Sequence, residues 1–205
     1  KKNYWLTLLF AEIYSFIGLF TSMSNIIKAL YPITAVFTIS GYYDASKNQV
    51  ILSCVSLLLC GGLDDNPKAI KEEDLKSVCD GEYIQWLGFR SDVLDLLKNS
   101  HIVAFPSYYK EGLPKSLIEA TAVGRPIITT NSIGCKETVI DGWNGFLIPI
   151  KDSDTLAEKL TFLIDNKELR QEMGMNSRAL AVKEFSIENV VDKHLEIYSY
   201  LINKK

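Results

Sequence analysis

The segment HIVAFPSYYKEGLPKSLIEATAVGRPIITT, residues 101–130, decides the fold of this chain. Its first five residues form an apolar run that ends at Pro106 and Ser107, which is typical of a buried strand followed by a turn. The composition of KSLIEATAV (115–123) predicts a helix, with Pro114 at the first helical position and GRP (124–126) at its end. The apolar run IITT (127–130) predicts the next strand. Strand, loop, helix and strand in this order indicate a βαβ unit with parallel strands.

Two carboxylates belong to this unit, Glu111 in the loop and Glu119 in the helix. The loop is expected at the carboxyl edge of the strands, where open α/β sheets bind ligands. Free backbone N–H groups around residues 115–117, together with the helix dipole, would favour an anion such as a diphosphate. Glu119 could accept paired hydrogen bonds from vicinal ribose hydroxyls. The spacing alone leaves open an ordinary loop acid and a dipole-favoured helix acid, because Glu188 and Glu196 have the same interval.

The rest of the chain continues the alternation of apolar runs and helical segments. SLLLC (56–60), YIQWL (83–87) and FLI (146–148) predict strands, and residues 68–78, 91–98, 154–164, 167–183 and 186–201 predict helices. This pattern indicates an α/β fold, a Rossmann-like parallel sheet with flanking helices. The last helix carries an apolar stripe that is expected to pack in the core or against another domain, formed by Val190, Val191, His194, Leu195, Tyr198 and Leu201.

Charge and composition exclude some classes of function. The net charge of −3, without a basic stripe, gives no support for nucleic-acid binding. With two histidines and four cysteines that form no CxxC pair, no metal-ligand set of recognisable spacing is present. We interpret the cysteines as reduced packing residues of a cytosolic protein.

The amino-terminal third differs from the remainder. Residues 1–63 carry six of the 47 charged side chains, and residues 4–27 contain a single charge, Glu12. A membrane-spanning helix, a membrane-lying helix and a buried helix all remain open for this segment, whereas a signal peptide lacks a clear cleavage site. We divide the chain into an atypical apolar segment, 1–50, and a domain, 51–205.

Five stretches carry a family resemblance: GGLDDNP (61–67), WLGFRSDV (86–93), FPSYYKEGLPKSLIEA (105–120), GRPIITTNSIGCKETVIDGWNGFLIP (124–149) and the terminal FS…IY pattern. In order and spacing, over about two-thirds of the chain, they resemble the C-terminal domain of retaining GT-B glycosyltransferases of family 4. The resemblance is strongest to bacterial enzymes of cell-surface polysaccharide synthesis. It implies the C-terminal half of a GT-B fold, in which a complete enzyme has a second domain.

The resemblance also implies roles for individual residues. Glu111 would contact the donor sugar and is the candidate catalytic residue, while Glu119 would contact the ribose. The loop and helix start near the diphosphate would comprise Gly112, Leu113, Pro114, Lys115 and Ser116. Phe89 and Arg90 would lie near the base. Such enzymes usually need no metal or other cofactor, and UDP is the expected carrier of the sugar; no protein nucleophile is assigned.

One departure concerns the phosphate clamp. Members of the family usually carry an Arg and a Lys-Gly pair some 25–35 residues before the strand matched by residues 56–60, but here only Lys28 lies in that region. Our hypothesis is that residues before about 50 are diverged, fused or frame-disrupted.

Two classes of function therefore stay open. The first is a hexosyl- or N-acetylhexosaminyl-type glycosyltransferase that uses a nucleotide-sugar donor and a cell-envelope glycan or polyprenyl-linked acceptor. It would act in the cytoplasm, at the inner face of the membrane. The second is a catalytically inactive remnant or a nucleotide-sugar-binding module. A GT-B epimerase or phosphorylase matches the motifs less well.

Overall fold

The structure is a computed structural model that describes residues 36–40, 56–63, 71–79, 84–108 and 112–204. Its strands are β1 (Val36–Ser40), β2 (Ser56–Cys60), β3 (Ile84–Trp86), β4 (Ile102–Phe105), β5 (Ile127–Thr130) and β6 (Gly145–Ile148). Its helices are α2 (Glu72–Val78), α3 (Val93–Lys98), α4 (Lys115–Ala122), α5 (Ser153–Asp165), α6 (Lys167–Glu184), α7 (Ile187–Asn203) and the short 3₁₀ helix η1 (Lys136–Thr138).

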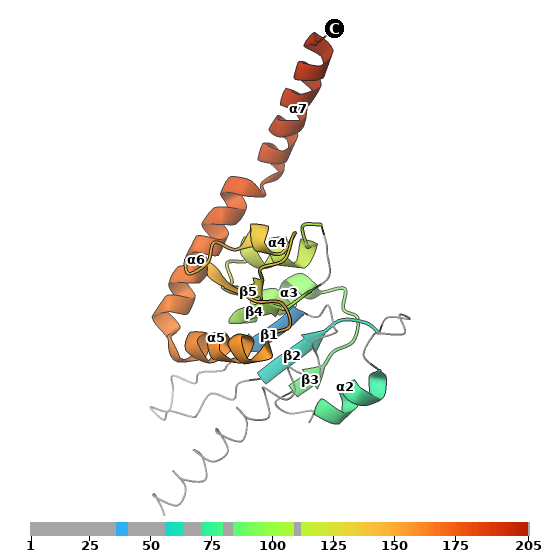
Figure 1. Cartoon of the computed structure of the whole chain (residues 1–205), viewed down its shortest axis with the longest axis vertical. Helices are drawn as coiled ribbons and strands as arrows, with labels where there is room; N and C mark the ends of the chain where they lie inside the picture. The colour runs from blue at the N-terminus through green and yellow to red at the C-terminus, as the bar shows by residue number, and fades with distance from the viewer. Residues whose placement is uncertain (1–35, 41–55, 64–70, 80–83, 109–111, 205) are drawn as a thin grey trace, which may run out of the picture.

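The six strands form one sheet in the order β3-β2-β1-β4-β5-β6 (Figure 1). The pairs β2–β3, β4–β5 and β5–β6 are parallel, as predicted for a Rossmann-like sheet. Strand β1 is antiparallel to both β2 and β4, so those two neighbours run in the same direction as each other. Five strands therefore share one direction and β1 opposes them. An apolar run carries no information about strand direction, which depends on how the chain enters and leaves the sheet.

Strand β1 belongs to the segment before residue 50, and it pairs with β2 and β4 at the centre of the sheet. This segment therefore contributes a strand to the fold of the domain that follows it. The division of the chain at residue 50 stays a prediction. Residues 4–27 lie outside the described residues, and within the described ranges no helix is both long and apolar enough to cross a bilayer.

Helices cover both faces of the sheet. On one face, Ile102 and Ala104 of β4 belong to a core that α2, α5 and α6 complete with residues such as Leu75, Leu160 and Met173. On the other face, Val103 and Phe105 pack with buried side chains of α3 and α4. Since side chains alternate along a strand, a strand buried on both faces must be apolar throughout, as β4 is.

The predicted βαβ unit is confirmed with small shifts at the helix ends. Helix α4 begins at Lys115, with Pro114 as its N-cap rather than its first helical residue. It ends in two hydrogen bonds typical of a Schellman motif, from Gly124 N–H to the Thr121 carbonyl and from Arg125 N–H to the Ala120 carbonyl. Gly124 has a φ of 71°, a left-handed conformation that glycine adopts without a steric penalty.

Helix α7 extends away from the rest of the chain (Figure 1). None of its residues is buried, and Val191, Leu195 and Leu201 are each about half exposed, at 46%, 56% and 57%. Of the two alternatives for its apolar stripe, packing in the core is therefore excluded for the described part of the chain, and packing against another domain stays a prediction. The helix follows α6 through a cap at Ser186, which accepts a hydrogen bond from Asn189 N–H.

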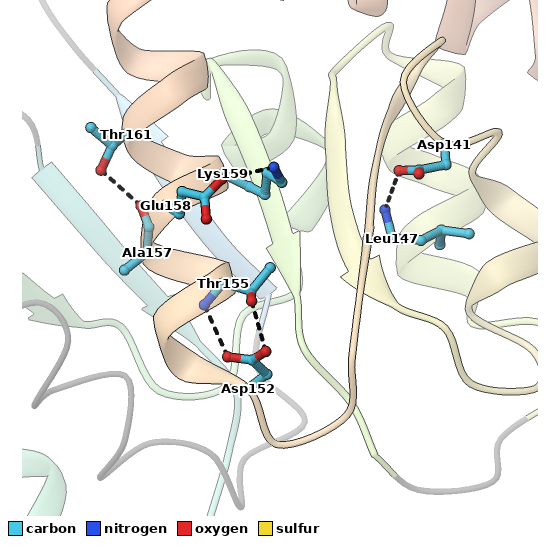
Figure 2. A network of polar contacts seen from close by, with 8 residues as sticks. All are labelled: Asp141, Leu147, Asp152, Thr155, Ala157, Glu158, Lys159 and Thr161. Carbon is cyan, nitrogen blue, oxygen red and sulfur yellow. Dashed lines mark hydrogen bonds and ion pairs between the residues drawn. The ribbon is translucent and has the colours of Figure 1, made fainter.

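Asp152 caps the amino terminus of α5 (Figure 2). Its carboxylate accepts hydrogen bonds from Thr155 N–H at 3.0 Å and from Thr155 Oγ1 at 2.7 Å. These bonds, the backbone one first, lower the pKa of Asp152 below its ordinary value. Because the folded-state pKa is the lower one, the ionised cap stabilises the fold above the unfolded-state pKa, and this contribution is lost as the pH falls through the folded-state pKa.

Asp152→Ala is expected to lower the Tm at pH 7 by about 2–4 °C, because it leaves the first turn of α5 without its acceptor. Asp152→Asn is the matched variant, since it keeps a capping oxygen and removes the charge. The Tm of the native protein should exceed that of Asp152→Asn, and this difference in Tm should be smaller at pH 3 than at pH 5. Thermal unfolding followed by circular dichroism measures both values. A difference in Tm that is the same at the two pH values would contradict the role of the ionised carboxylate.

Candidate functional site

The carboxyl ends of the five parallel strands lie along one edge of the sheet. The strand order reverses between β1 and β4, the kind of position at which open α/β sheets bind ligands. Helix α4 follows β4 at this edge, as the βαβ unit predicts. Because β1 runs the opposite way, its amino end at Val36 pairs with Cys60 at the same edge. The chain after Ser40 therefore leaves the sheet at the far edge.

The amino terminus of α4 offers backbone donors. Leu117 N–H and Ile118 N–H both donate to the Pro114 carbonyl, at 3.1 and 3.2 Å. Leu117 therefore does not belong to the free donors predicted around residues 115–117. The N–H groups of Lys115 and Ser116 remain, and the described residues provide no acceptor for them. Such donors at the positive end of a helix dipole suit a phosphate oxygen.

Glu119 lies on the side of α4 that faces away from the core. Leu117, Ala120 and Thr121 are buried beneath the helix, whereas the Glu119 side chain retains 22% of its exposure. Lys115 Nζ, whose side chain is 89% exposed, lies 3.5 Å from Glu119 Oε1. A pair this long and this open to water holds the carboxylate only weakly. Glu119 is therefore available to accept hydrogen bonds from a ligand.

The loop after β3 carries Phe89 and Arg90 at the same edge. Gly61 N–H donates to the Gly88 carbonyl at 3.0 Å, and the Phe89 side chain is 83% exposed. An exposed aromatic ring can stack against a planar base. Strands β2 and β1 lie between β3 and β4, so the part of the edge that holds this loop is separated from the α4 part by three strand spacings, about 14 Å.

Arg90 is already paired. Its Nε and Nη2 atoms donate to the two Asp92 carboxylate oxygens at 2.7 and 2.5 Å. This bidentate pair raises the pKa of Arg90 and lowers that of Asp92, in both cases mainly through the hydrogen bond. Arg90 is thus oriented by Asp92.

The remaining predicted site residues are placed only in part. Gly112 and Leu113 are exposed and Pro114 is buried, all directly before α4. Glu111, the candidate catalytic residue, lies outside the described residues, and its role stays a prediction. Glu137 accepts a hydrogen bond from Gly134 N–H at 2.7 Å, which orders the loop after β5.

Sequence reasoning missed Lys151 as a neighbour of this site. Its Nζ lies 4.7 Å from the centroid of the Tyr108 ring, in the segment that leads to α4. Lys151 has a φ of 60°, so it occupies a left-handed position where glycine would be expected. A lysine in a loop after IPI gives no signal of this contact in the sequence. In the described part of the chain, no group of three or more His, Cys, Asp or Glu side chains could hold a metal ion.

Comparison with known proteins gives matches that agree with one another. Residues 46–180 match the family of glycosyl transferases group 1. The chain is 32% identical over 147 residues to the N,N'-diacetylbacillosaminyl-diphospho-undecaprenol alpha-1,3-N-acetylgalactosaminyltransferase of Campylobacter jejuni, covering 72% of this chain and 38% of that protein. It is 34% identical over 119 residues to the UDP-Gal:alpha-D-GlcNAc-diphosphoundecaprenol alpha-1,3-galactosyltransferase of Escherichia coli, covering 58% of this chain and 30% of the enzyme.

A solved structure gives the same result for the fold. The crystal structure of Anabaena HepE in complex with UDP superposes with a TM-score of 0.64 at 25% identity, over 71% of this chain and 41% of HepE. The chain thus spans about two-fifths or less of the length of these proteins, which agrees with a single domain of a GT-B glycosyltransferase. On the family match and the Campylobacter relative together, this chain belongs to the glycosyl transferases group 1.

Proposed function

We propose that this chain is the donor-binding domain of a glycosyltransferase that takes a sugar from a UDP-sugar and retains its anomeric configuration. The observation that carries the proposal is the position of Glu119. It lies on the helix that follows β4, with a half-buried carboxylate whose ion-pair partner among the described residues is the exposed Lys115. A carboxylate one turn beyond free helix N–H groups suits a ligand in which a ribose follows a diphosphate.

The comparisons support this choice of donor. HepE was crystallised with UDP and also with UDP-glucose, and the Escherichia coli relative is described as using UDP-Gal. In our proposal, the ribose binds Glu119, the diphosphate binds the backbone of Gly112–Ser116 together with Lys115, and the base lies against Phe89. Glu111 would contact the transferred sugar. No metal or other cofactor takes part.

The acceptor is proposed from the same relatives. Both the Campylobacter and the Escherichia coli proteins are named for acceptors that carry a diphospho-undecaprenol group. We infer that the transferred sugar is a hexose or an N-acetylhexosamine and that the acceptor is a polyprenyl-linked glycan of the cell envelope. The reaction would then take place in the cytoplasm, at the inner face of the cell membrane.

A second candidate function is nucleotide-sugar binding without transfer. The observation in its favour is the antiparallel β1, which brings the amino end of a strand to the edge of the site. In addition, Arg90, a described cation near the site, already has a carboxylate partner in Asp92. A protein of this kind would bind UDP but release no sugar.

Calorimetric titration of UDP into the purified chain, followed by GDP, tests the shared part of both candidates. We expect UDP to bind with a Kd of about 1 μM, which corresponds to about 8 kcal/mol, and GDP to bind more weakly. Addition of EDTA should leave the UDP affinity unchanged, because no metal is expected in the site. If neither UDP nor GDP binds, the proposed donor site is contradicted.

Turnover tests for the transferase. UDP-galactose and UDP-N-acetylglucosamine would be incubated with the chain and a short polyprenyl-diphosphate glycan, and release of UDP would be measured. UDP release that depends on the acceptor supports the transferase and contradicts the binding module. UDP binding without release fits the binding module and also a donor-binding domain that needs a second domain for transfer.

A further inference from the structure

Two consecutive threonines at the end of β5 donate hydrogen bonds to the chain that leaves β4. Thr129 Oγ1 donates to the Phe105 carbonyl at 2.7 Å, and Thr130 Oγ1 donates to the Ser107 carbonyl. Both threonines are fully buried, and Ser107 is 2% exposed. Phe105 is the last residue of β4 and pairs with Thr129 in the sheet, whereas Ser107 lies beyond the strand. Only the Thr130 bond therefore acts on the segment that leads to α4.

The proton of the Thr130 hydroxyl can go to one acceptor only. A carbonyl oxygen cannot donate, so Thr130 must donate to Ser107. Thr130 Oγ1 also lies 2.9 Å from Ser132 Oγ, and in that contact Ser132 must then be the donor. The Thr130 hydroxyl thus joins the segments that follow β4 and β5, at the carboxyl edge where the candidate site lies.

We propose that Thr130 is a positioning residue for nucleotide binding, since its hydroxyl sets the direction in which the chain leaves β4. The proposal rests on the proposed function. The next residue, Tyr108, lies half-buried with Lys151 Nζ over its ring, and α4 with its free N–H groups begins a few residues later. Without the hydroxyl, the Ser107 carbonyl loses this donor at a residue that is almost closed to water, a cost that a shift of the segment would reduce.

The chain offers a matched control at the neighbouring position. Thr129→Val and Thr130→Val each remove one buried hydroxyl that donates to a backbone carbonyl, with the same change of shape. A purely structural role predicts that UDP affinity changes to the same extent, if at all, in both variants. A positioning role predicts a fall in Tm for both, at least as large in Thr130→Val because that variant also loses the Ser132 contact, and a loss of UDP affinity mainly in Thr130→Val. Thr130→Ser keeps the hydroxyl and serves as the rescue.

The first measurement is UDP affinity by calorimetry. We expect Thr130→Val to weaken UDP binding about tenfold, Thr129→Val to change it less than twofold, and Thr130→Ser to restore most of the affinity. The inference is overturned if Thr130→Val binds UDP as the native chain does, or if Thr129→Val weakens binding equally. Absence of UDP binding by the native chain would instead contradict the proposed function.

The second measurement needs no nucleotide. Hydrogen–deuterium exchange of peptides covering residues 106–117 should be faster in Thr130→Val than in Thr129→Val, by about threefold or more, and should return toward the native rate in Thr130→Ser. Equal exchange in the two valine variants would overturn the inference even if no nucleotide binds.

Discussion

Replacing Glu119 with alanine is expected to weaken UDP binding by about a hundredfold or more, the largest effect of any single side chain in the candidate site. A carboxylate that accepts hydrogen bonds from both ribose hydroxyls makes two charge-assisted bonds, each contributing about 1.5–3 kcal/mol. Each 1.4 kcal/mol corresponds to a factor of ten in affinity. Glu119→Gln keeps the shape and one acceptor oxygen, so it should retain part of the affinity. Calorimetric titration of UDP measures both variants.

A modified nucleotide makes this test specific for the ribose contact. Binding of 2′-deoxy-UDP should be weaker than that of UDP in the native chain, and this preference should largely disappear in Glu119→Ala, which has no acceptor left. Glu196→Ala is the control, because Glu196 lies exposed on α7, away from the sheet. The Tm should hardly change in Glu119→Gln, since the long pair with the exposed Lys115 contributes little. A preference for UDP that survives in Glu119→Ala would assign the ribose to another residue.

Gly145→Ala is expected to have the largest effect on stability, at least about 4 kcal/mol, which is a large fraction of the stability of a typical domain. A Cβ atom on Gly145 would lie 1.8 Å from the Ile127 carbonyl oxygen and 2.8 Å from its carbon. Both atoms belong to the backbone of β5, so no side-chain rotation can relieve the clash. The variant must separate β6 from β5 or fail to fold. Urea unfolding followed by circular dichroism measures the loss.

Gly142→Ala, in the turn directly before β6, is the matched control. No atom lies within 4 Å of the Cβ position at Gly142, but its φ is 75°. Alanine there meets only the cost of a left-handed backbone, about 1–2 kcal/mol. Gly145→Ala should therefore be much less stable than Gly142→Ala. Equal stabilities would show that β6 can shift away from β5 at little cost.

Much of the fold follows from local patterns in the sequence. The apolar run at β4, the turn residues after it and the Gly-Arg-Pro stop at the end of α4 are local signals. The structure confirms β4, α4 and β5 within about one residue of the predicted bounds. The three C-terminal helices are confirmed in the same way. Local signals suffice here because a strand buried on both faces and a capped helix each require particular residue types at particular positions.

The candidate site could be predicted only in part. The sequence pointed to Glu119 and the start of α4 because helix composition places them on one element. It gave no indication that Arg90 is held by Asp92 or that Lys151 lies over Tyr108, since these contacts join residues whose chemistry would suit a solvated loop equally well. Asn144 shows the same limit. Its Asn-Gly pair predicts a loop, but its buried side chain receives a hydrogen bond from Ile140 N–H and donates to Ser177 on α6.

The α/β class, the βαβ unit and the helix that carries Glu119 could thus be predicted from the sequence, because they depend on residues close together in the chain. Three other features became visible in the fold: the antiparallel course of β1, the exposure of α7 and the bond from Thr130 to Ser107. Strand direction, helix burial and contacts between neighbouring strands depend on how distant segments meet. A pattern of apolar and polar residues marks which faces seek burial, but the partner that covers each face is chosen by the packing of the whole domain.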